Sequence, residues 1–332
     1  MFSSLALALG IALVTAWASL ALWYRVPFPE TIRGLAAGVF AIGGLAAIVA
    51  LFTRWRRSAL IVFLAAFAAM LAWWSTIHPQ AHGDWAPDVA RQTTGKVERN
   101  TLTLTDVRDF EWRSNTDFTE RWTTRTYDLT KLKTIDLFMT YWSGPKIAHP
   151  ILSFGFEGGE FIAWSIEVRA LRGGEFSPIA DFFRNSPLVI VAADERDVVR
   201  LRTNVRDEQV QLYRLRASPE VARSVLLEYV TDSNALAETP RFYNSIFTNC
   251  TTAIVKIVRV AGVSVPFDWR LIVNGFLPEF LYERGALDTR TPLAVLRARG
   301  DVVERAKAAG DLPDFSRLIR IGVPSPWGAP PS

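Results

Sequence analysis

Three long apolar stretches near the N-terminus constrain this chain more than any other feature. Residues 2–24, 35–52 and 59–77 contain no charged side chain. A helix that crosses a bilayer needs roughly 20 such residues, and its backbone must satisfy its own hydrogen bonds there. No Lys or Arg precedes the first stretch, and two more apolar stretches follow it. Both features argue against a cleaved signal peptide. We therefore predict a region of three transmembrane helices at residues 1–77.

The loops between these stretches predict their orientation. Arg54, Arg56 and Arg57 lie in the second loop, whereas the first loop carries two arginines and one glutamate. Because the more positive loop stays in the cytoplasm, the third helix leads outward. We expect everything after residue 77 to lie outside the cytoplasm.

The net charge of +4 does not indicate a nucleic-acid partner. Five arginines, one glutamate and no lysine fall within the first 77 residues, so the membrane region accounts for the excess and the rest of the chain is neutral. No basic field is left to attract a polyanion. We expect no nucleic-acid partner.

The remainder divides into a polar juxtamembrane linker (78–100), one globular domain (101–322) and a loose Pro-rich tail (323–332). The linker contains His78 and His82, but no further group of metal ligands accompanies them. We predict neither a metal site nor a cofactor.

Alternating and helical patterns in the domain predict a mixed α+β fold around an antiparallel sheet. Strands are expected at 101–107, 136–141, 151–156, 161–170, 188–192 and 209–215, helices at 219–232 and 251–261, and a mostly helical region at 276–309.

Residues 149–169 form a hairpin pattern whose register can be deduced. Even-numbered positions are apolar on both arms, so both arms must bury their even-numbered face. A two-residue Gly-Gly loop would pair odd positions with even ones. A three-residue loop with Gly159 in the left-handed conformation avoids this and pairs Phe156 with Glu160.

The same register places His149 opposite Glu167 on the polar face of the hairpin. A carboxylate that orients a histidine is the arrangement that a general base needs. Ser165 lies on the same face, two residues nearer the turn, and is the alternative orienting group. An ordinary polar strand surface explains these side chains equally well.

Cys250 is the only cysteine, which excludes a disulfide framework. It falls in the first turn of the helix predicted at 251–261, where Thr248 or Asn249 is a suitable N-cap. Free amides and the helix dipole at this position favour a thiolate and can hold a developing oxyanion. One cysteine, one histidine and one carboxylate suggest nucleophilic catalysis, although a buried, inert thiol remains an alternative.

A charged aromatic stretch at 110–127 supplies the candidate substrate-binding residues. Arg113, Arg121 and Arg125 alternate with aromatic side chains, including Tyr127, and this combination suits a lipid phosphate at a membrane surface. A solvated surface with ordinary ion pairs is the alternative. Asn249, beside the cysteine, is a further candidate.

Several short motifs distributed along the domain share one specific pattern: Trp85–Val89, Thr116–Thr119, Arg125–Leu129, Asp136–Phe138, Tyr141–Trp142, Ile147–His149, Ser165–Glu167, Ala193–Asp197, Leu201–Asn204 and Thr248–Thr252. Over roughly residues 84–290 the chain resembles the N-terminal periplasmic domain of bacterial Lnb-type lipoprotein N-acyltransferases. The resemblance implies a circularly permuted NlpC/P60 (papain-like) domain, with Cys250 as nucleophile and His149 as base. Glu167 as the third member rests on the hairpin register instead.

The resemblance further implies a thiol acyltransferase in the bacterial inner membrane, with its domain in the periplasm. It would move an acyl chain from a phospholipid, through a Cys250 thioester, to a lipoprotein amine. A cysteine peptidase or amidase acting on cell-wall peptide is the alternative, and a catalytically inactive scaffold is a third. The largely apolar segment 271–281 favours the lipid substrate, because it is suited to line an acyl channel. Lnb-type enzymes are expected to carry their membrane helices after the soluble domain, so the resemblance supports the chemistry more directly than the substrate.

Overall fold

The computed structural model describes residues 2–174 and 176–327, and the chain forms two compact units. The first unit combines Met1–Gln80 with two internal segments, Phe176–Pro187 and Arg241–Ser245. The second unit contains the remaining residues.

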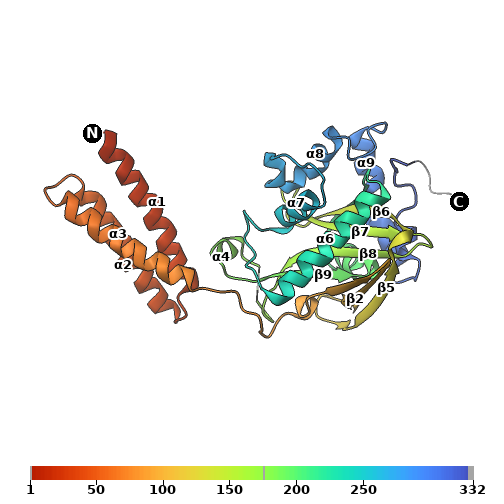
Figure 1. The fold of residues 1–332 in the computed structure, drawn as a ribbon, viewed down its shortest axis with the longest axis horizontal. Helices are drawn as coiled ribbons and strands as arrows, with labels where there is room; N and C mark the ends of the chain where they lie inside the picture. Colours follow the sequence, from red (N-terminus) through yellow and green to blue (C-terminus); the bar gives the residue numbers. More distant parts are fainter. Residues whose placement is uncertain (1, 175, 328–332) are drawn as a thin grey trace. The chain divides into compact units, whose positions relative to one another are not determined.

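Three helices long and apolar enough to cross a bilayer make up most of the first unit: α1 (Phe2–Arg25), α2 (Glu30–Ala50) and α3 (Arg56–Ser75) (Figure 1). They confirm the predicted transmembrane region. Small residues let α1 and α2 approach closely, since a Cβ added at Gly44 would lie 2.1 Å from the Thr15 hydroxyl.

The two internal segments pack against these helices within the first unit. A short helix, α4 (Pro178–Phe182), leads to Phe183, whose ring stacks on Tyr24 with centroids 5.6 Å apart. Arg184 donates a hydrogen bond to the Trp74 carbonyl at 2.8 Å.

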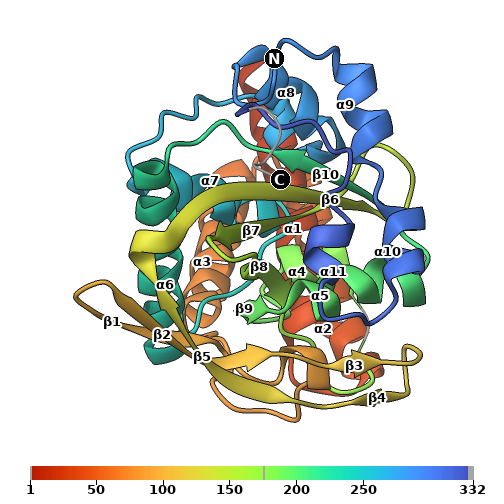
Figure 2. The same cartoon turned by 90° about the vertical axis from the view of Figure 1, so that its right-hand side faces the viewer.

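The second unit is built on an eight-stranded sheet with the strand order β1-β2-β9-β8-β7-β6-β10, and β5 pairs with β2 (Figure 2). Among the described strands of this sheet, all neighbours pair in the antiparallel direction except β2 and β9, which pair in parallel. The strands are β1 (Thr94–Glu98), β2 (Thr101–Arg108), β5 (Trp122–Asp128), β6 (Leu132–Tyr141), β7 (His149–Phe156), β8 (Phe161–Val168), β9 (Leu188–Ala193) and β10 (Gln209–Arg214); β3 (Glu111–Trp112) and β4 (Phe118–Thr119) form a separate small hairpin.

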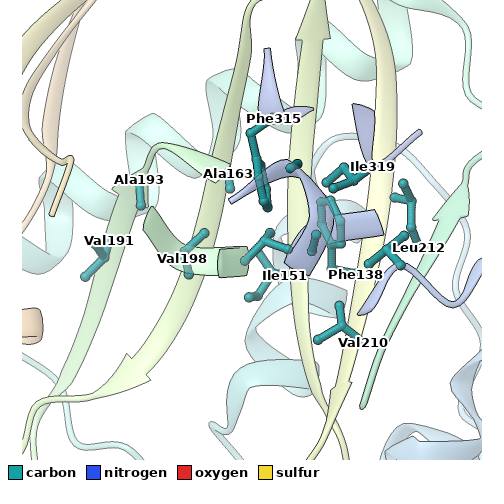
Figure 3. Close-up of a cluster of buried hydrophobic side chains, with 14 of the residues drawn as sticks. Phe138, Ile151, Ala163, Val191, Ala193, Val198, Val210, Leu212, Phe315 and Ile319 are labelled. Atoms are coloured by element: carbon teal, nitrogen blue, oxygen red, sulfur yellow. The ribbon is translucent and has the colours of Figure 1, made fainter. Parts of the chain in front are cut away.

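Helices cover both faces of the sheet. One face lies under α6 (Pro219–Glu238) and α7 (Cys250–Val260), and the other under α5 (Glu195–Arg200), α10 (Val303–Ala309) and α11 (Phe315–Leu318) (Figure 2). A buried apolar cluster fills the second interface, as Figure 3 shows for side chains of the central strands against Phe315 and Ile319. The helices α8 (Leu277–Glu283) and α9 (Leu293–Gly300) follow α7 in the chain.

The mixed α+β fold is confirmed, but two features differ from the sequence-based expectation. The polar face of the β7–β8 hairpin is not solvated: every residue of β7 is buried, because helices pack on both sides. Part of the segment expected to be a linker forms the edge strand β1. In the expected tail, Val323 packs against the core, and residues 328–332 lie outside the described residues.

Candidate active site

The β7–β8 hairpin has the register deduced from its alternation. Leu152 pairs with Trp164, and the Phe156 N–H donates to the Glu160 carbonyl at 2.9 Å. The three-residue turn uses the positive φ of 85° at Gly159, as predicted, and glycine tolerates this angle without steric cost.

This register brings His149 together with both candidate orienting groups. Nε2 of His149 lies 2.7 Å from the Ser165 hydroxyl and 3.1 Å from a Glu167 carboxylate oxygen. The Ser165 hydroxyl donates to the same Glu167 oxygen at 2.6 Å. Serine and carboxylate therefore act on one nitrogen as a connected pair, which leaves the other ring nitrogen for a different partner.

A further partner of His149 comes from the start of α7. Cys250 is buried, is the first residue of the helix, and its side chain hydrogen-bonds to His149. Thus the structure brings Cys250, His149 and Glu167 into one site, in a nucleophile–base–carboxylate order.

The side chain of Asn249 fixes where α7 begins. Its oxygen accepts the amides of Thr251 and Thr252 at 3.0 and 2.9 Å, and the Thr252 hydroxyl accepts the Asn249 N–H at 2.9 Å. This reciprocal capping box starts the helix at Cys250, one residue earlier than predicted. It also occupies two of the first-turn amides that were expected to hold an oxyanion, so those two are not available for that role.

Electrostatics favour a protonated histidine. Burial and the Arg202 cation act to lower the pKa of His149, but the Glu167 carboxylate, together with the hydrogen bond with Cys250, raises that pKa to about 9. Burial likewise acts to raise the pKa of Glu167, yet His149, Arg202 and Ser165 hold it well below its usual range. At neutral pH the pair is therefore an imidazolium and a carboxylate.

Residues 118–275, which include Cys250, His149 and Glu167, match the family model of the Lnb N-terminal periplasmic domain. Over these residues the chain is similar to that family. The match confirms the resemblance carried by the motifs, and with the three apolar helices it makes the chain a membrane protein with a periplasmic domain. No curated protein and no solved structure matches the chain, so the permuted papain-like topology stays a prediction.

The site contains a charged residue that was not predicted from the sequence. Arg202, nearly fully buried, donates to the Glu167 carboxylate at 3.2 Å and to Glu208 at 3.1 Å. It lies in a π-helical turn, Leu201–Val205, and such turns are frequent at functional sites. The motif Leu201–Asn204 was the available signal, but its contact with the hairpin depends on the fold.

A second residue that was not selected joins the two catalytic elements. The Asn274 amide exchanges hydrogen bonds with both backbone groups of Ala148, at 2.9 and 2.6 Å, and donates to the Thr251 hydroxyl at 2.6 Å. Ala148 precedes His149, and Thr251 follows Cys250. Asn274 thereby ties the start of β7 to the start of α7.

Most of the predicted substrate-binding residues are engaged elsewhere in the second unit. Arg113 pairs with Asp117, Arg121 with Asp109, and Arg125 with Asp194 and Asp109, while Tyr127 is buried against Phe156. None of the four contacts the histidine, serine or carboxylate of the site in the described part of the chain. Of the predicted set, only Asn249 lies beside the cysteine, and its role there is to cap the helix. The described residues also contain no group of three or more His, Cys, Asp or Glu suited to a metal.

Proposed function

We propose that this protein is a membrane-tethered cysteine acyltransferase that moves an acyl chain from a phospholipid to the N-terminal amine of a lipoprotein at the bacterial inner membrane. Similarity to the family points to a membrane-associated enzyme that modifies lipoproteins. The observation that carries the finer proposal is the hydrogen-bonded series Cys250, His149 and Glu167.

In the first half-reaction, the Cys250 thiolate attacks the ester carbonyl of the phospholipid, and a carbon–sulfur bond forms. The ester carbon–oxygen bond then breaks, and His149 gives its proton to the departing lysolipid oxygen. The raised pKa of His149 suits this step, because the imidazolium holds the required proton at neutral pH. Glu167 stabilises the imidazolium until the transfer.

In the second half-reaction, the acceptor amine attacks the thioester carbonyl. Neutral His149 takes a proton from the nitrogen as the carbon–sulfur bond breaks, which regenerates thiolate and imidazolium. An amide has formed and no net proton is consumed at the site. Three membrane helices support this scheme, since a bilayer anchor keeps the enzyme in the compartment of both lipid substrates.

Intact-protein mass spectrometry tests the proposal. Full-length protein in phospholipid nanodiscs should carry a fatty-acyl adduct that hydroxylamine removes, and Cys250→Ala should carry none. A diacylglyceryl-cysteine peptide with a free amine should discharge the adduct, whereas the N-acetylated peptide should not. Hydrolysis of cell-wall peptides by a protein that never acquires an adduct would establish the peptidase alternative instead.

A further inference from the structure

An apolar cavity of about 260 Å³ lies in the second unit beside the nucleophile's helix. It is larger than the ~150 Å³ apolar cavities that stay dry in proteins and bind benzene. Aliphatic and aromatic side chains dominate its lining, and the polar residues at its wall are Thr251, Ser264, Arg216 and Arg284. The cavity is therefore built for an apolar ligand larger than a single ring.

One face of α7 forms a side of this cavity. Thr251, Ile254, Val255 and Val258 all line it, and their spacing of three or four residues places them in one row along the helix. From Thr251 to Val258 the row extends roughly 10 Å at the α-helical rise. Its first member directly follows Cys250, and Pro150, which follows His149, lines the same cavity. The cavity thus begins one residue after Cys250 and continues along the helix, and its lining does not include Cys250 or His149 themselves.

Residues 263–271 line another side of the cavity, and this segment also exposes large aromatic side chains. Val263, Val265 and Leu271 face the cavity. Phe267 and Trp269, between them in the chain, are 79% and 55% exposed. An exposed Phe and Trp on one short segment suit the bilayer interface better than water. This segment indicates that the apolar ligand comes from a lipid.

We propose that this cavity holds the acyl chain of the Cys250 thioester and sets which chain lengths the enzyme transfers. The inference rests on the proposed function and adds to it the site that recognises the chain. A chain attached at Cys250 would extend along α7 past Val255 and Val258. Exposed Arg216 and Arg284, which form no ion pair within the described residues, lie at the cavity wall, where an anionic headgroup can be held.

Two valines on α7 provide a matched test. Val258 lines the cavity, whereas Val260, two residues on, is 60% exposed and does not. Val258→Phe shortens the cavity and Val258→Ala enlarges it with little change to the fold. Val260→Phe adds the same bulk to the same helix outside the cavity and serves as the control.

The full-length variants would be given an equimolar mixture of phosphatidylethanolamines with chains from decanoyl to octadecanoyl, and the adducts weighed. Val258→Phe should raise the ratio of decanoyl to hexadecanoyl adducts at least about tenfold, which is the lower end of the discrimination that one methylene group produces in an apolar pocket. Val258→Ala should shift the distribution toward longer chains, and Val260→Phe should match the wild type.

The outcomes separate the two proposals. Adducts that form with the same chain-length distribution in Val258→Phe, Val258→Ala and the wild type would overturn the cavity proposal and leave the acyltransferase intact. Absence of any adduct in the wild type would overturn the proposed function itself. If Val258→Phe fails to fold, Val258→Ala alone decides, because an unchanged distribution in that variant refutes the cavity as the site of the chain.

Discussion

Replacing Glu167 with glutamine tests whether the Glu167 carboxylate raises the pKa of His149. The carboxylate is the main influence that raises the pKa of His149, acting against burial, which lowers it. Glu167→Gln keeps the size and a hydrogen-bonding oxygen but removes the charge. We expect the pKa of His149 to fall from about 9 to 6.5 or below, because burial is then opposed mainly by the cysteine.

The size of this change follows from the shift itself. A difference of one pKa unit corresponds to about 1.4 kcal/mol between the two protonation states. The rise of the His149 pKa from 6.5 to about 9 therefore represents about 3 kcal/mol in favour of the imidazolium. Losing most of this stabilisation of the imidazolium would leave His149 largely neutral at physiological pH.

Nuclear magnetic resonance can measure this directly, because the chain has three histidines. His78 and His82 are exposed and can be replaced by glutamine, which leaves His149 as the single labelled imidazole. The carbon shift of its ring would be followed against pH in wild-type and Glu167→Gln backgrounds. Glu160→Gln, an exposed carboxylate on the same hairpin, is the control.

An unchanged titration of His149 in Glu167→Gln would refute the reasoning. It would mean that the carboxylate does not stabilise the imidazolium and that another group raises the pKa. A fall of the same size in Glu160→Gln would equally count against it, since that effect could not come from a direct contact.

Three further outcomes follow from the same contacts. The raised pKa of His149 contributes stability that is fully present below pH 6.5 and is lost as the pH rises through about 9. The thermal unfolding midpoint of the wild type should therefore fall across that pH window, and that of Glu167→Gln should fall less. Equal falls of the midpoint in the two proteins would contradict this. Cys250→Ala and His149→Ala should each abolish acyl transfer, and the double variant should be no worse than either, because the two residues work as a unit; residual transfer in Cys250→Ala would exclude the thioester. Asn274→Ala leaves both polar groups of Ala148 without their partner and should cost about 2–3 kcal/mol in denaturant unfolding, whereas a change within error would show that water replaces the amide.

Local rules were sufficient to predict much of the site from the sequence. In the 149–169 hairpin, apolar and polar residues alternate along both arms, and the turn has an odd number of residues. Together these two features determine which residues face one another, and they place His149 opposite Glu167. Helix periodicity and a capping residue located Cys250 at a helix start. Both inferences depend on residues close together in the chain.

Contacts between distant segments could not be deduced in the same way. Arg202 reaches Glu167 across 35 positions, and Asn274 reaches Ala148 across 126. No periodicity within either segment indicates its partner, since the contact exists only once the helices have packed on the sheet. For the same reason the choice between Ser165 and Glu167 was framed as exclusive, although the folded hairpin places both on one nitrogen.

The groups around His149 imply that its pKa changes during the reaction. Two cations, His149 and Arg202, lie among two anions, Glu167 and Glu208, so this group is neutral before the nucleophile is counted. The hydrogen bond between Cys250 and His149 also helps to raise the pKa of His149. Formation of the thioester replaces this contact with an acylated sulfur, which carries neither a proton nor a charge.

We therefore expect the acylated enzyme to hold a histidine with a lower pKa, which is what the second half-reaction needs from a base that takes a proton from an amine. Cys250→Ala mimics the loss of this hydrogen bond. In the single-histidine background, the pKa of His149 in Cys250→Ala should lie below that of the wild type but above that in Glu167→Gln, because the carboxylate contributes more than the cysteine. A value equal to the wild type would show that Cys250 does not influence the histidine, and the proposed change between the two half-reactions would then have no electrostatic basis.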